Sequence, residues 1–236
     1  MANNLPYSLQ DLQDRIHTLV DNDPDTPETT DDEWEVRLNL INQAIGKWES
    51  QDVFWDELWS TYTGTTIAAG TTSYSLAGLT NMKKPGGFLT LTLNGQTQEV
   101  SFISPEELQA YSGEVRAAYI TGNNSAGYTL VLGWTPATGD GTVGATFGFP
   151  YYKFATRFNS VSLATDKPEM SDPNYIVYDV AAAKSLMESK NNQFSIYSTE
   201  AGSSLDRMKV MNEVTAPYSA GFMEDVDFIN GAILGE

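Results

Sequence analysis

The stretch from Thr30 to Trp59 constrains the fold most, because a helical repeat of bulky side chains changes there to β-type sequence. It opens with Thr30-Asp31-Asp32-Glu33, the pattern of a helix capping box. Large apolar residues then recur at near-heptad spacing, which indicates a long amphipathic helix over residues 31–50. Four of the five tryptophans lie in this stretch, and it carries no reactive side chain. We therefore expect a segment that packs and assembles, with these residues in subunit packing: Trp34, Leu38, Ile41, Ile45, Trp48, Trp55 and Trp59.

The charge of the chain excludes some classes of partner. The net charge is −18, of which −11 falls in residues 1–60 and −5 in residues 213–236. Such an acidic protein repels phosphate, which disfavours simple DNA or RNA binding. The chain has no cysteine, so it has neither disulfides nor thiolate chemistry. It has no apolar run of 18 residues, and its first residues lack the basic and apolar parts of a signal peptide, so no membrane association is expected.

Three further helices are expected outside the central part of the chain. One covers residues 9–20, with Ser8 as its N-cap and Asp11 in the first turn. A second runs over residues 174–190, with Asp172 as N-cap and Pro173 at the first helical position. The third covers residues 193–212, and the short connection before it predicts that the last two helices are antiparallel.

Between the helices the sequence is typical of β-structure. Asn94-Gly95 between two β-prone runs predicts a tight hairpin. Ser104-Pro105-Glu106-Glu107 predicts a short capped helix over residues 105–111. Six or seven short strands separated by turn residues favour an antiparallel β-barrel or sandwich. The predicted class is α+β: a bundle of N- and C-terminal helices with an inserted β-domain.

The same pattern divides the chain into four parts. We expect a helical hairpin over residues 1–58, a β-domain over 59–160, and a connector with a second helical hairpin over 161–212 that packs on the first. Residues 213–236 scatter apolar residues among Gly, Asp and Glu, so this segment is either a frayed terminus or a docking tail. The partner-binding residues of such a tail would be Phe222, Val226, Phe228, Ile229, Ile233 and Leu234.

No combination of residues supports a metal, cofactor or catalytic site. The Asp21-x-Asp23-x-Asp25 spacing resembles a calcium loop, but Thr26 stands where such a loop needs Gly and Asp32 where it needs Glu. The lone His17 has no evident ligand partners. We therefore expect no bound metal, no cofactor and no enzyme activity.

Three other groups invite a chemical reading. The paired carboxylates Glu106 and Glu107 lie in a first helical turn, where they stabilise the helix dipole. Gly202-Ser203-Ser204 has no histidine partner for ester hydrolysis. Trp134 and the tyrosines permit sugar stacking, so a carbohydrate- or surface-binding β-module remains an alternative.

The order of these pieces resembles a known family. It comprises two acidic helices joined by an Asp/Pro loop, the motif Ile103-Ser104-Pro105-Glu106-Glu107, the strand Phe149-Pro150-Tyr151-Tyr152-Lys153, the connector Asp166-Lys167-Pro168-Glu169, and a helix pair ending Arg207-Met208-Lys209. Over residues 5–212 this arrangement is similar to the head-to-tail adaptor (connector) proteins of tailed bacteriophages, which include the tubular tail protein A type of short-tailed phages.

The resemblance implies a non-catalytic ring, commonly of twelve copies, in the neck of the virion between the portal protein and the tail or nozzle protein. Such a homo-oligomer passes DNA through its channel without specific binding and is made in the host cytoplasm. In related adaptors a C-terminal segment reaches the portal, although residues 222–234 carry no matching motif. Another virion tail-completion protein is a further alternative.

Overall fold

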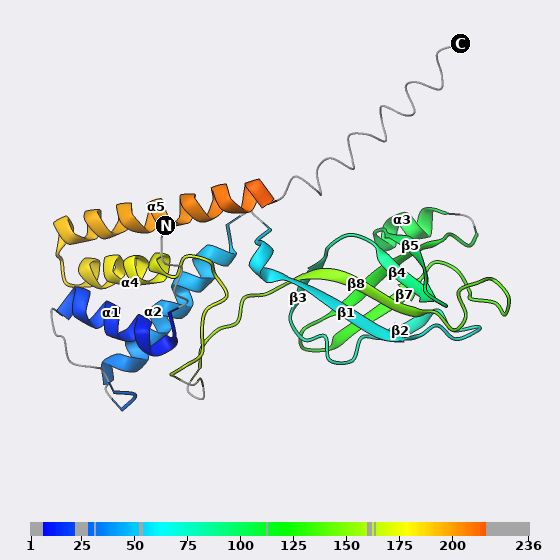
Figure 1. Ribbon diagram of the computed structural model, residues 1–236, viewed down its shortest axis with the longest axis horizontal. Coiled ribbons are helices and arrows are strands. Elements are labelled where there is room, and N and C mark those ends of the chain that lie inside the picture. Colours follow the sequence, from blue (N-terminus) through cyan, green and yellow to red (C-terminus); the bar gives the residue numbers. More distant parts are fainter. Residues whose placement is uncertain are drawn as a thin grey trace, which may run out of the picture. The chain divides into compact units, whose positions relative to one another are not determined.

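The computed structural model describes residues 7–21, 28–30, 32–51, 54–111, 113–159, 162 and 164–215. The chain divides into two compact units (Figure 1). The helical unit combines Met1–Glu57 with Ala155–Glu236, and the β unit is Leu58–Phe154. Helices at both ends of the chain with a sheet between them confirm the predicted α+β class.

The helical unit is built around one central helix. It contains α1 (Leu9–Asp21), α2 (Asp32–Glu49), α4 (Asn174–Met187) and α5 (Asn191–Thr215). Helix α4 contacts each of the other three (Figure 1). Its alanines 181 and 182 are buried, and such small side chains let neighbouring helix backbones approach closely. The predicted bundle of N- and C-terminal helices is confirmed.

Helix α1 begins at Leu9, directly after its predicted N-cap Ser8. The Ser8 side chain accepts a hydrogen bond from the backbone N–H of Asp11 (3.2 Å), and the Ser8 N–H donates to the Asp11 carboxylate (2.8 Å). The Ser8 N–H and the Ser8 hydroxyl both donate to the Asp11 carboxylate, and these two bonds lower the pKa of Asp11. The backbone carbonyls of Asp166 and Ala164 accept from the N–H groups of Leu9 and Gln10. The N–H groups of the first turn have no partner within the helix. They are hydrogen-bonded here by the Ser8 side chain and by the backbone of the connector.

The segment that follows the β unit is fastened to α2 by side chains. The Asn42 amide donates to the carbonyl of Phe158 (2.7 Å) and accepts from its N–H (2.9 Å). At the C-terminal end of the same helix, the buried carboxylate of Glu49 accepts from the Arg157 guanidinium at 2.7 Å. A single amide that satisfies both backbone groups of one residue fixes the position of this segment, because both groups would otherwise lack partners.

The start of α4 differs by one residue from the prediction. Pro173 is the N-cap and makes no side-chain capping bond, whereas Asp172 was expected there. Asp172 still accepts from the backbone N–H of Asn174 (3.2 Å), so its carboxylate serves the helix start from one position earlier. The following connection, residues 188–190, is three residues long, and Asn191 and Asn192 belong to α5 instead of the loop.

The β unit is one curled eight-stranded sheet (Figure 1). Its strand order is β1-β8-β4-β5-β6-β7-β2, and β3 pairs with β8 beside this path. The strands are β1 (Trp59–Thr66), β2 (Ser73–Ser75), β3 (Met82–Pro85), β4 (Leu89–Leu93), β5 (Gln96–Phe102), β6 (Ala117–Asn123), β7 (Gly127–Leu132) and β8 (Thr146–Lys153). A 3-10 turn, η1 (Asp56–Leu58), precedes the first strand.

The predicted hairpin and capped helix are both present. Asn94 and Gly95 have positive φ angles of 53° and 78° and join β4 to β5 in a two-residue loop, as a type I′ turn requires. Ser104 and Glu107 form a complete capping box at the start of α3 (Pro105–Ala110). Because α3 lies between β5 and β6, these strands pair in parallel. The sheet is therefore mixed, and the expectation of wholly antiparallel pairing is wrong at this pair.

The sheet curls around one apolar core. It is filled by aliphatic and aromatic side chains from all parts of the unit, with rings of Tyr62, Tyr74 and Phe149 among them. The sheet has eight strands, whereas the sequence predicts six or seven. The strand that was not expected is β3, whose Lys83-Lys84-Pro85 sequence is typical of a turn. It forms because Met82 is buried in the core and Pro85 pairs with Tyr151 at the strand end, where a missing N–H is tolerated.

Candidate assembly surfaces

The residues predicted for subunit packing lie mainly inside the chain's own core. Six of the seven are buried: Trp34, Leu38, Ile41, Ile45, Trp48 and Trp55. The rings of Trp48 and Trp55 stack with centroids 5.2 Å apart, and the Trp55 indole donates to the Trp48 carbonyl. Side chains buried in this way stabilise the helical unit. Of the seven, only Trp59, which is 45% exposed, is accessible to a second chain.

Trp59 forms an exposed aromatic surface on the β unit. Its ring stands edge-on to Tyr152 of β8, with centroids 4.9 Å apart. A Cβ at position 86 would lie 2.5 Å from the indole, so Gly86 leaves the space that the ring occupies. Large aromatic side chains held in place but open to solvent are enriched in protein–protein interfaces.

The helical unit exposes apolar side chains at both ends of α5. Leu186 and Met187 close α4, and Ile196 follows in the first turns of α5. At the other end, Val210 and Met211 are exposed close to where Asn212 donates to the Phe54 carbonyl. Apolar side chains that gather at element ends are candidates for contact with other chains.

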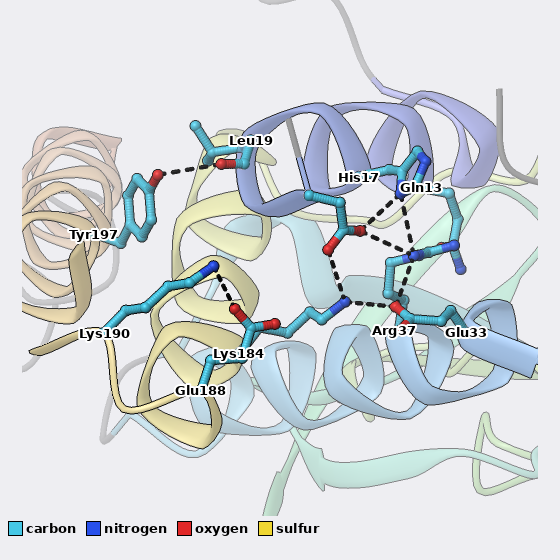
Figure 2. A network of polar contacts seen from close by, with 10 residues as sticks. Gln13, His17, Leu19, Glu33, Arg37, Lys184, Glu188, Lys190 and Tyr197 are labelled. Atoms are coloured by element: carbon cyan, nitrogen blue, oxygen red, sulfur yellow. Dashed lines mark hydrogen bonds and ion pairs between the residues drawn. The ribbon is translucent and has the colours of Figure 1, made fainter. Parts of the chain in front are cut away.

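A cluster of charged side chains around the buried Arg37 joins three helices of the same unit (Figure 2). Arg37 of α2 is 1% exposed; its Nε donates to Gln13 of α1 at 2.7 Å, and its Nη1 lies 3.2 Å from the Glu33 carboxylate. Lys184 of α4 donates to the same carboxylate at 2.6 Å. A buried cation is tolerated only when its donors are paired, so this cluster fixes the relative positions of α1, α2 and α4.

His17 and Asp21 belong to the same cluster. His17 Nδ1 lies 2.7 Å from Asp21 Oδ2 and 3.5 Å from Arg37 Nη1, and Asp21 Oδ1 lies 3.5 Å from Lys184 Nζ. Asp23 and Asp25, the other members of the possible calcium loop, fall outside the described residues. Among the residues that the structure describes, no three or more His, Cys, Asp and Glu side chains are grouped so as to hold a metal ion.

The remaining candidate groups for chemistry have structural partners. The Glu107 carboxylate accepts from the Ser104 N–H at 2.8 Å. The buried Ser204 hydroxyl donates to Asp172 at 3.0 Å, as does Arg207. Burial raises the pKa of Asp172, but these bonds and those from Asn174 outweigh it and hold the pKa below its usual value. Trp134, considered for sugar stacking, is 4% exposed and lies under the Arg116 guanidinium.

Sequence reasoning missed Arg37 and Lys184. For Arg37 the sequence did contain a signal of a buried ion pair. It is one of three bases in the first 60 residues, and it stands beside Leu38 of the apolar repeat. It also follows Glu33 by four positions, the spacing of neighbours on one helix face. No local signal identifies Lys184, because its partners are about 150 positions away. The predicted docking residues Phe222, Val226, Phe228, Ile229, Ile233 and Leu234 all lie outside the described residues.

Comparison with known families decides the class of protein. The sequence model of a family described as SU10 adaptor protein matches residues 7–220. The chain belongs to the SU10 adaptor protein family. This is a family of phage head–tail adaptors, so the chain is a phage structural adaptor that contacts other virion components. No curated protein matches the chain significantly.

Membership in the family covers both units, since the match extends from before α1 to beyond α5. The exposed apolar and aromatic side chains are therefore candidates for contacts within a phage particle. Throughout the described part of the chain, no helix is both long enough and apolar enough to cross a membrane.

Proposed function

We propose that this chain is a structural ring subunit of the virion neck, similar to the tubular tail protein A type, that joins the portal protein to the tail or nozzle protein. The family match over residues 7–220 carries this proposal, because the family consists of phage head–tail adaptors. The ring, commonly of twelve copies in related proteins, forms part of the channel through which DNA is ejected.

The mechanism is mechanical and electrostatic. Each copy adds a net charge of −18 to the ring, and any part of it that faces the channel repels the DNA backbone. DNA then slides without adhering, although salt screens this repulsion beyond about 8–10 Å. The acid-rich segment 21–35 is the candidate for an acidic edge of the ring, and its residues 28–30, which include Glu28, are exposed.

Contacts between copies and neighbours use the surfaces that the subunit's own core leaves open. Trp59 is one aromatic candidate in the β unit, and Met187 and Ile196 are the most exposed apolar side chains of the α4–α5 turn region. Residues 213–236 anchor an adjoining component of the particle through their apolar residues.

Imaging of the assembled particle tests the proposal. A cryo-electron microscopy map should contain an annulus of these subunits between the portal and the tail, and its symmetry gives the copy number. Light scattering of the purified chain with and without portal rings checks assembly separately. A map without such an annulus, or a purified chain that turns over a small molecule, would contradict the proposed role.

A further inference from the structure

A groove of about 560 Å³ lies between β3 and the turn that joins β6 to β7 in the β unit. Tyr128 lines the groove, and its hydroxyl lies 2.7 Å from the Met82 carbonyl and 2.8 Å from the Asn124 side-chain oxygen. Phe154, which is 39% exposed, stands at the rim. We call it the lysine groove, and its lining is Met82, Lys83, Lys84, Pro85, Ile120, Gly122, Asn123, Asn124, Ser125, Tyr128 and Phe154.

The groove concentrates the positive charge of the β unit. Residues 58–154 contain four basic side chains, and two of them, Lys83 and Lys84, line the groove. A third, Lys153 of β8, is the register partner of Met82 and lies on the neighbouring strand, outside the lining. Within a chain whose net charge is −18, this groove therefore combines basic and apolar side chains.

One segment of the same chain has the complementary chemistry. Residues 222–228 read Phe-Met-Glu-Asp-Val-Asp-Phe, three carboxylates between two phenylalanines, and residues 213–236 contain five acids and no base. The family match ends at residue 220, so this acidic segment lies beyond the pattern that the family shares. The pattern of charge and apolar side chains matches lysines next to Phe154 and Ile120.

We propose that the lysine groove binds residues 222–228 of a second copy of this chain. This inference rests on the proposed function in one respect: it needs copies of the chain to lie side by side, as they do in a ring. A segment from one copy in a groove of the next makes a head-to-tail contact, the kind that generates rings. From Thr215, where α5 ends, an extended chain reaches about 45 Å to Phe228.

The absence of cysteine allows a direct test on the full-length chain. Two single variants, Ser125→Cys at the groove and Val226→Cys in the acidic segment, are mixed under mild oxidation, one of them carrying a size tag. A covalent heterodimer of these two can form only between copies. It should form at least about tenfold faster than the heterodimer of Val226→Cys with Thr97→Cys, an exposed control position outside the groove, because binding raises the effective thiol concentration.

Charge reversal separates specific docking from chance collision. Adding K83E and K84E to the Ser125→Cys chain should slow heterodimer formation about tenfold, since like charges then oppose the segment. The matched reversal K167E with K190E, outside the groove, should leave the rate unchanged. Adding E224K and D225K to the Val226→Cys chain should restore the rate with the reversed groove.

Equal rates for the groove and control pairs would overturn the proposal, as would binding of duplex DNA that depends on Lys83 and Lys84 and leaves the thiols unlinked. The outcome is separate from that of the ring proposal. An annulus in the particle without this cross-link rejects the groove alone, and a fast cross-link without an annulus rejects the ring alone.

Discussion

At the scale of single residues, buried charges decide how the helical unit is held together. Arg37 and Lys184 are buried among apolar side chains, yet both contact the carboxylates of Glu33 and Asp21. Desolvation makes an unpaired charge costly, whereas a paired one can be nearly neutral. The helices are therefore held in the one arrangement that keeps these groups paired.

Replacing Arg37 by Met should lower the free energy of unfolding by about 1–3 kcal/mol, because the buried Gln13 side chain loses its hydrogen-bond donor. Urea denaturation followed by tryptophan fluorescence measures the change. The control is Lys47→Met, which removes an exposed ion pair with Asp179 and should cost under about 1 kcal/mol. Equal effects of the two substitutions would show that the buried cluster contributes no more than a surface pair.

Asp140 gives the β unit a defined response to acid. Its carboxylate accepts from the backbone and hydroxyl of Thr142 and from the Ala137 N–H, which lowers its pKa from 3.8 to about 2. A depressed pKa means that the ionised group stabilises the fold above pH 3.8, and that this contribution is lost as the pH falls towards 2.

Asp140→Asn should therefore unfold at a lower temperature than the natural chain at pH 7, with the difference shrinking between pH 3.8 and 2. Calorimetry across this range measures it. Glu99→Gln makes the same charge change at an exposed site of β5 and serves as the control. A difference that stays constant with pH would contradict the role of the Asp140 carboxylate.

At the scale of elements, the ends of the helices show where neighbouring residues alone are sufficient to predict a boundary. Ser8 with Asp11, and Ser104 with Glu107, form capping bonds from adjacent sequence, so both starts were predictable. The sequence predicts the end of α4 three residues late, at 190 instead of Met187. The signal is missing because Ser189, which has a positive φ of 60° just after the helix, occupies a position that is usually glycine.

Replacing Ser189 by Gly should raise the free energy of unfolding by about 1 kcal/mol, since an L side chain pays roughly that amount in this conformation. Thermal unfolding followed by circular dichroism measures the gain. Ser203→Gly, at an exposed position in the middle of α5, is the matched control and should lower the free energy of unfolding by about 0.5 kcal/mol instead. A loss at position 189 would show that the serine side chain has a stabilising contact there.

At the scale of the whole molecule, the described residues end with α5, and we propose that the acidic segment after it serves assembly. Deleting residues 216–236 should leave the unfolding free energy unchanged within about 1 kcal/mol, the range of changes away from a core. Attachment to the particle should weaken, as measured by the copies retained in purified virions. Failure of the truncated chain to fold would place the segment in the core of the subunit.

Sequence alone determined the features that depend on neighbours along the chain. The amphipathic period of α2, the Asn94-Gly95 hairpin and the α3 capping box arise from interactions over two to seven residues, and all are present. The α+β class followed from their order. Local chemistry suffices for these features because each hydrogen bond or apolar stripe closes within its own element.

Tertiary structure decided the features that join distant parts of the chain. It assigned six of the seven predicted packing residues to the subunit's own core, paired β5 with β6 in parallel, and made a strand of the turn-like sequence Met82–Pro85. It also brought Lys153 beside Met82 and Lys184 to Glu33. The physical reason is that burial and charge pairing depend on which surfaces meet in space, and helical or β periodicity specifies a face without specifying its partner.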